Sequence, residues 1–191
     1  MKLLPTDLPG VVVVEPAVFG DERGWFMESW NGPRFEAGLR ELGLPAAGAF
    51  VQDNHSCSKA GVLRGLHYQL PPHPQGKLVR VVRGAAFDVA VDIRRASPHF
   101  GRWTGVELTA DNRRQLWIPP GFAHGFLALE DETHFLYKTS GPYARDCERA
   151  IRWDDAAIGI AWPLERISGA PLIAAKDAAA PPLAAAEVFE S

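Results

Sequence analysis

The sequence of 191 residues has few cysteines, no long apolar run and no large excess of charge of either sign. Cys57 and Cys147 are too few for a disulfide framework and suit a reducing compartment. No apolar stretch approaches the roughly 18 residues that a membrane-spanning helix needs. Residues 1–7 contain no apolar h-region, which argues against a secretory signal. We therefore expect a soluble protein of the cytoplasm that does not contact a membrane.

The balance of charge and the turn-forming residues narrow the class of protein further. Lys and Arg number 20 against 23 Asp and Glu, so the net charge of −3 disfavours a nucleic acid polymer as partner. Glycine (18) and proline (16) are abundant beside 47% hydrophobic residues, which indicates a globular chain with many turns and more sheet than helix. Neither an internal repeat nor a linker is evident, so residues 1–191 are expected to form a single domain.

Hydrophobic periodicity predicts one helix and many short strands. Asn31 can cap a helix in which Phe35 and Leu39 recur at helical spacing, with Gly43 as its stop. Elsewhere, alternating or β-branched runs separated by turn residues are typical of an antiparallel β-sandwich or jelly roll. The Ala- and Pro-rich tail after Gly169 is expected to be a loosely packed arm. The extended stretches are predicted at residues 11–14, 25–30, 62–69, 78–82, 87–93, 105–108, 115–118, 125–129 and 134–138.

A metal site is the first chemical hypothesis for the histidines, and the spacing disfavours it. A histidine pair in a small β-barrel would place a second ligand two residues after His67, where Gln69 stands. His124 by itself cannot complete a shell of three or four protein ligands. Cys57 and Cys147 are isolated in the sequence. We therefore expect no metal ligands.

Metal-free acid–base chemistry is the second hypothesis. It needs a base with a pKa near neutrality, a cation for a developing oxyanion and a proton donor. His67, Lys77 and Tyr137 are the residue types required. Their spacing alone does not bring them together, and a surface lysine and a strand tyrosine remain the simpler interpretation of Lys77 and Tyr137.

Anion binding is the third hypothesis. Guanidinium groups match the oxygens of a diphosphate, and most arginines are simply solvated. Arg23 and Arg64 differ from the rest because each lies beside a glycine in an extended stretch that also carries aromatic or amide side chains.

Six sequence motifs decide among these hypotheses. They are FGDERG at 19–24, VQDNHS at 51–56, VLRGLHYQ at 62–69, QGKLVR at 75–80, FDVAVDIR at 87–94 and IPPGFAHGF at 118–126. In identity and order, these motifs closely resemble those of the dTDP-4-dehydrorhamnose 3,5-epimerase family. The resemblance extends from about Val11 to Asp177, which is nearly the whole chain.

The resemblance implies a fold, a reaction and an assembly. The implied fold is an all-β, cupin-type jelly roll, with one short helix near the N-terminus and a C-terminal arm. The implied reaction is epimerisation of dTDP-4-dehydro-6-deoxy-D-glucose at C3 and C5 to dTDP-4-dehydro-L-rhamnose, on the route to dTDP-L-rhamnose, with no metal or organic cofactor. The implied assembly is a homodimer with exchanged N-terminal strands.

The resemblance also implies roles for individual residues. His67 matches the base and Asp177 the carboxylate that pairs with it; Lys77 matches the lysine near the C4 oxygen and Tyr137 the acid. Ala174 departs from a serine common in relatives, which bears on hydrogen bonding in the arm. The positions matched to substrate contacts are Arg23, Phe26, Glu28, Gln52, Asn54, Arg64, His124 and Tyr143. The resemblance implies that Arg23 and Glu28 reach the site from the neighbouring subunit.

Three alternatives stay open at the level of sequence. A single-site epimerase, acting at C3 or C5, or a ketoisomerase of a related dTDP-4-keto sugar would share the same motifs. A non-catalytic sugar-nucleotide-binding module would keep Arg23 and Arg64 but could dispense with His67 or Tyr137. A metal-dependent cupin oxygenase is disfavoured by the missing histidine pair. The lack of a Gly-rich dinucleotide fingerprint agrees with a reaction that has no redox step.

Overall fold

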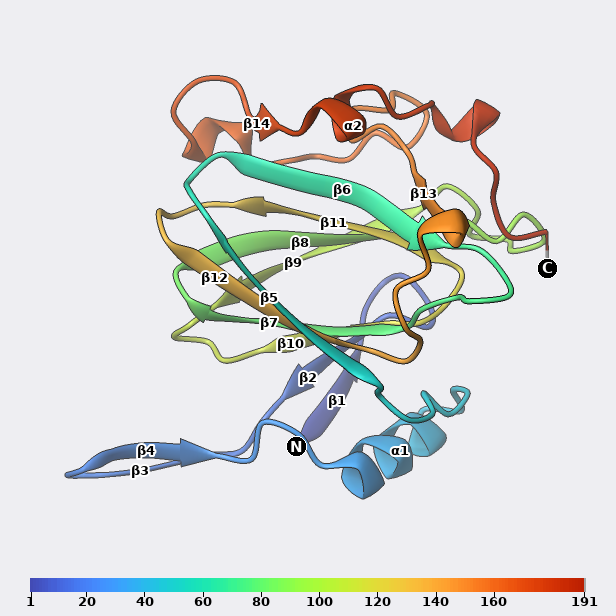
Figure 1. Ribbon diagram of the computed structural model, residues 1–191. Coiled ribbons are helices and arrows are strands. Elements are labelled where there is room, and N and C mark those ends of the chain that lie inside the picture. The colour runs from blue at the N-terminus through green and yellow to red at the C-terminus, as the bar shows by residue number, and fades with distance from the viewer. Residues whose placement is uncertain (191) are drawn as a thin grey trace.

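The computed structural model describes residues 1–190, and most of its regular structure lies in two antiparallel sheets that face each other (Figure 1). The first sheet is six-stranded. In spatial order, its strands are β1 (Lys2–Pro5), β2 (Val12–Glu15), β10 (Gln115–Ile118), β7 (Lys77–Arg83), β12 (Thr133–Thr139) and β5 (Gln52–Ser58).

The second sheet lies across the core from the first. Its main path, in spatial order, is β13 (Glu148–Ala150), β6 (Val62–Gln69), β11 (Phe122–Ala128), β8 (Ala85–Asp92) and β9 (Trp103–Thr109). Strands that are neighbours in space are often distant in sequence, as in the pairing of β6 with β11. Two such antiparallel sheets confirm the predicted jelly roll.

The hydrophobic core explains why the sequence adopts this arrangement. Between the sheets, Val79 and Leu116 of the first pack in one cluster with Ala90, Leu108 and Phe126 of the second. A separate cluster lies on the outside of the second sheet. With both faces covered, β8 and β11 are buried along almost their full length.

Helix α1 (Gly32–Glu41) covers the outside of the first sheet and confirms the predicted helix. The Asn31 side chain accepts a hydrogen bond from the backbone N–H of Arg34, as a helix cap does. Phe35 and Leu39 are fully buried, and Phe35 packs edge-on against Trp117 of β10. None of the helices within residues 1–190 is long and apolar enough to cross a membrane.

The prediction of a loosely packed tail is wrong. Strand β14 (Leu172–Ile173) runs parallel to β6, and the short helix α2 (Ala175–Ala178) and the 3-10 helix η3 (Leu183–Ala185) follow it. Leu183 and Val188 are buried against the second sheet. Because the buried apolar residues of the tail are few and irregularly spaced, its sequence has no periodicity that would reveal this packing.

A two-stranded hairpin of β3 (Val18–Asp21) and β4 (Gly24–Met27) projects away from both sheets (Figure 1). Phe19, Trp25 and Phe26 are exposed on it. The extended stretch predicted at 25–30 ends at Met27, and the chain then turns into α1. Large exposed apolar side chains on a projecting element are typical of an interaction surface.

Candidate active site

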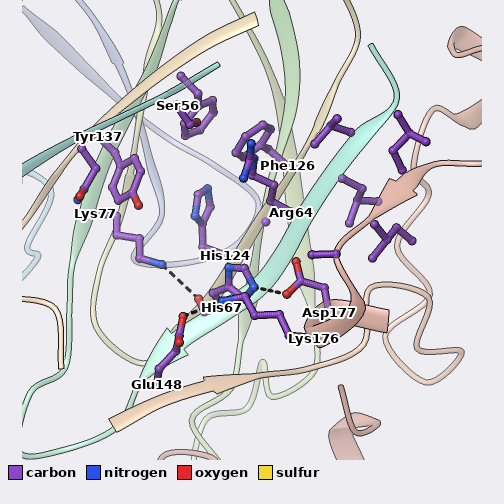
Figure 2. A pocket seen from close by; sticks show the side chains of 18 of the residues that line it. Ser56, Arg64, His67, Lys77, His124, Phe126, Tyr137, Glu148, Lys176 and Asp177 are labelled. Carbon is purple, nitrogen blue, oxygen red and sulfur yellow. Dashed lines mark hydrogen bonds and ion pairs between the residues drawn. The ribbon is translucent and has the colours of Figure 1, made fainter. Parts of the chain in front are cut away.

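A cavity of about 650 Å³ lies between the two sheets, at the edge that the C-terminal tail covers. Strands β5, β6, β7, β11 and β12 contribute its walls, together with the α2 segment. Figure 2 shows four side chains around it that come from three strands and the tail: His67, Lys77, Tyr137 and Asp177. The fold thus brings together all four residues predicted to be catalytic.

His67 and Asp177 form a hydrogen-bonded pair at one wall of the cavity. His67 Nε2 lies 2.7 Å from Asp177 Oδ1, while Asp177 Oδ2 accepts the backbone N–H of Gly65 at 3.2 Å. Asp177 is 2% exposed, and its burial opposes ionisation; the hydrogen bond and charge of His67 outweigh burial and lower the pKa of Asp177. The aspartate therefore remains a carboxylate that orients the imidazole, and Nδ1 is the ring atom left to take a proton.

Lys77 and Tyr137 are the cation and the proton donor that the hypothesis of metal-free acid–base chemistry requires. Lys77 Nζ donates a hydrogen bond to the carbonyl of His67 at 3.3 Å. Burial lowers the pKa of Lys77 to about 8, against the opposing charges of Asp88 and Glu148. Burial raises the pKa of Tyr137 above its usual range, so the phenol keeps its proton at neutral pH. The cavity therefore contains a base, a cation and an acid.

A second histidine–aspartate pair lies next to the first. His124 of β11 is the direct cross-strand partner of His67, and its Nε2 lies 2.7 Å from Asp88 Oδ1 on β8. Burial is the main cause of a lowered pKa for His124 and a raised pKa for Asp88. Asp88 was not predicted as a site residue. Its signal in the sequence is a carboxylate at the centre of a strand that is otherwise apolar up to Asp92 at its end.

The close approach of β6 and β11 depends on a glycine. Gly65 has φ +125°, and a Cβ there would lie 2.6 Å from the Cα of Gly125 and 2.8 Å from the carbonyl oxygen of His124. Such distances exclude any side chain unless the backbone moves. Gly65 therefore holds His67 and His124 side by side on two strands.

Most of the predicted substrate positions surround the same region. Asn54, Arg64 and His124 line the large cavity. Gln52 and Tyr143 line an adjoining cavity of about 320 Å³, which shares His67, Lys77 and Tyr137 with the large one. The Gln52 side chain accepts the backbone N–H of Tyr143 at 3.1 Å. A long ligand could therefore occupy both cavities at once.

Three predicted substrate positions are not brought to the cavity of their own chain. Arg23 pairs with Asp21 within the hairpin, and its side chain is 84% exposed. Phe26 is 69% exposed on the same hairpin. Glu28 accepts hydrogen bonds from Asn31 and Arg34 at the start of α1.

Comparison with known proteins gives the family. The family model described as dTDP-4-dehydrorhamnose 3,5-epimerase matches residues 5–185. The chain belongs to this family. It is 56% identical over 178 residues to the dTDP-4-dehydrorhamnose 3,5-epimerase of Shigella flexneri, with 93% of each chain covered.

Solved structures of the epimerase family have the same fold. The Legionella pneumophila enzyme in complex with dTDP-4-keto-L-rhamnose superposes with a TM-score of 0.90 at 42% identity and covers 100% of this chain and 98% of its own. A 3'-monoepimerase from Streptomyces bikiniensis in complex with dTDP-quinovose has a TM-score of 0.84 at 36% identity, covering 95% and 87%. The fold is therefore common to epimerases of different specificity.

Two charged residues of this epimerase-family cavity were missed by sequence reasoning. Glu148 accepts hydrogen bonds from Lys176 at 3.2 Å and from the Tyr143 hydroxyl at 3.0 Å. Lys176 could have been noticed as the neighbour of Asp177, whereas nothing in the sequence around Glu148 sets it apart. Across residues 1–190, no three side chains of His, Cys, Asp or Glu converge as a metal site would require.

Proposed function

We propose that this protein converts dTDP-4-dehydro-6-deoxy-D-glucose into dTDP-4-dehydro-L-rhamnose by inverting C3 and C5, as a step of dTDP-L-rhamnose biosynthesis in the cytoplasm. The observation that carries the proposal is the convergence of the His67–Asp177 pair, Lys77 and Tyr137 on one cavity. Membership of the epimerase family and 56% identity to a named 3,5-epimerase support it.

The chemistry follows from the C4 ketone of the substrate. A ketone acidifies the hydrogens on both neighbouring carbons, so a base of moderate strength can remove them. His67 takes the proton, and the carboxylate of Asp177 stabilises the imidazolium that forms. Lys77, as a cation, stabilises the enolate oxygen. Tyr137 then returns a proton to the opposite face of the carbon, which inverts the centre.

The nucleotide part of the substrate requires a cationic and aromatic environment. Arg64 of the same chain would bind the diphosphate, while Gln52, Asn54 and Tyr143 line the adjoining cavity. His124, which lies beside His67, would contact the sugar. We assign Arg23, Phe26 and Glu28 to the cavity of a neighbouring subunit, because their own chain leaves them outside its cavity. The exposed hairpin is the element that would be exchanged in a homodimer.

A single-site epimerase is the second candidate. The likeness to a 3'-monoepimerase, at a TM-score of 0.84, favours it because the same scaffold serves that reaction. The two candidates share the base, the cation and the acid. They differ in how many carbons of the sugar exchange a proton with solvent.

The deciding experiment is incubation of the purified protein with the 4-keto sugar nucleotide in deuterated water. Two inverted centres require deuterium at both C3 and C5, measured by NMR and mass spectrometry. Label at one carbon favours the single-site epimerase. Label at neither carbon rules out both candidates.

A further inference from the structure

Asp155 lies outside the cavity, and its carboxylate joins two segments of the chain, residues 155–158 and the C-terminal tail at Leu183. It is 5% exposed. One oxygen, Oδ1, accepts the backbone N–H groups of Ala157 at 2.8 Å and Ile158 at 3.3 Å. The other, Oδ2, accepts the backbone N–H of Leu183 in the C-terminal tail at 2.7 Å.

The hydrogen bond from Asp155 gives the first backbone N–H of the 3-10 helix η3 an acceptor that the helix itself does not provide. The first N–H groups of a helix have no partner within it. Pro182, which precedes η3, provides no side-chain cap, and Asp155 supplies the missing acceptor. The backbone N–H of Arg152 adds a second link to the same place by donating to the carbonyl of Pro181 at 2.9 Å.

Asp177 lies between two points at which the tail is attached to the rest of the fold: the Asp155–Leu183 hydrogen bond and the pairing of β14 with β6. On the N-terminal side of Asp177, β14 pairs with β6, and the backbone N–H of Leu172 donates a hydrogen bond to the carbonyl of Gly61 at 2.7 Å. The helix that carries Asp177, α2, has four residues, and Ala174 at its N-cap makes no side-chain hydrogen bond. A helix this short is marginal by itself. Its position therefore depends on the attachments on either side, in addition to the hydrogen bonds of Asp177 itself with Gly65 and His67.

We infer that Asp155 is a positioning residue, which holds the tail so that the Asp177 carboxylate stays in hydrogen-bond contact with His67. The inference rests on the role of Asp177 in the proposed function. A misplacement of about 1 Å in a catalytic group can cost roughly 100-fold in rate. Loss of the Leu183 hydrogen bond would loosen the tail six positions beyond Asp177, with the Arg152–Pro181 bond left as the nearest link. The pair with His67 would then be aligned less well.

The test uses Asp155→Ala and Asp155→Asn in the full chain, alone and combined with Asp177→Asn. The asparagine is nearly the same size, but only its amide oxygen can accept, so one of the two sets of N–H groups loses its acceptor. We expect kcat to fall roughly 10- to 100-fold, with unchanged affinity for dTDP, and amide exchange in residues 174–183 to quicken. Asp154→Ala is the matched control, because Asp154 pairs with Arg152 at the surface; it should keep the wild-type kcat.

The double variants separate positioning from a general loss of stability. If Asp155 acts through Asp177, its substitution should change kcat less than about twofold once Asp177 is already Asn. An equal loss in both backgrounds, or a folded Asp155→Asn protein with wild-type kcat, would overturn the inference and leave the proposed function intact. Full turnover by Asp177→Asn alone would overturn the inference together with the role assigned to Asp177, whereas the proposed epimerisation would stand.

Discussion

His67 and Asp177 are 110 positions apart in the sequence, yet His67 Nε2 lies 2.7 Å from Asp177 Oδ1. The contact exists because β14 aligns beside β6 and places the α2 segment over the strand that carries His67. The His67–Asp177 pair is therefore completed by the C-terminal part of the chain. Its chemistry depends on how that tail is held.

Removing either member of this pair should abolish most of the turnover. In His67→Ala there is no base, and in Asp177→Ala the imidazole loses both its orientation and the charge that stabilises its protonated form. General acid–base catalysis contributes about 100- to 10,000-fold, so we expect losses of kcat in that range. Turnover is measured by NMR of the sugar product.

The control for this prediction is nucleotide binding. Neither residue is assigned to the dTDP part of the substrate, so calorimetry should give a Kd for dTDP close to that of the wild type. A variant with near-normal turnover would contradict the assigned roles. A large loss of dTDP affinity would point instead to a collapsed cavity.

The pH dependence of turnover should have an alkaline limb that belongs to Lys77. Burial lowers the pKa of this lysine to about 8, so the cation that stabilises the enolate is present below that pH and is lost above it. Tyr137 cannot cause the same limb, because burial raises its pKa. We expect kcat/KM to fall as the pH rises through about 8. In Lys77→Arg, whose guanidinium stays charged, the limb should disappear at lower overall activity.

Tyr137→Phe should separate proton removal from inversion. The base His67 is still present in this variant, but the proton donor on the opposite face is gone. We expect deuterium from solvent to enter the substrate with its configuration retained, while the inverted product forms at least roughly 100-fold more slowly. NMR distinguishes labelled substrate from labelled product. Inverted product at the wild-type rate would assign the acid to another residue.

Local features of the fold could be predicted from the sequence, because they depend on neighbours along the chain. The Asn31 cap, the spacing of Phe35 and Leu39 and the strand around Val89 are of this kind. The packed tail could not be predicted, since its few buried apolar residues, such as Leu183 and Val188, follow no regular period. Of the hairpin, only the second strand was expected to be extended, and its projection away from the sheets leaves no local signal.

For the candidate site too, the sequence could predict which residues take part but not how they come together. His67, Lys77, Tyr137 and Asp177 could be named from motifs, but their convergence depends on strand pairings between distant segments. Asp88 is recognised only once β8 is known to be buried on both faces, because a charge in an alternating strand normally faces solvent. Residue types are thus readable from sequence, whereas contacts across the sheets require the fold.

Gly65→Ala should lower stability because the added methyl has no room. Its Cβ would meet the Cα of Gly125 at 2.6 Å, and φ +125° is itself strained for alanine. Forcing an extra carbon into a packed site costs about 1 to 3 kcal/mol, and we expect at least that loss in the free energy of unfolding by urea. Gly169→Ala is the control, since its φ of +78° is also left-handed but no atom lies within 4 Å of its Cβ. Equal losses in the two variants would show that backbone strain, rather than the contact of β6 with β11, explains the glycine.

The placement of Arg23 in a neighbouring subunit can be tested by complementation. Arg23→Ala and His67→Ala proteins should each be nearly inactive alone. In a mixed dimer, the cavity of the Arg23→Ala chain keeps its own His67 and receives Arg23 from the other chain, so one complete site forms. With random pairing, co-expression should restore about a quarter of the wild-type activity. If Arg23 instead served its own cavity, every site in the mixture would lack one of the two residues, and no activity would return.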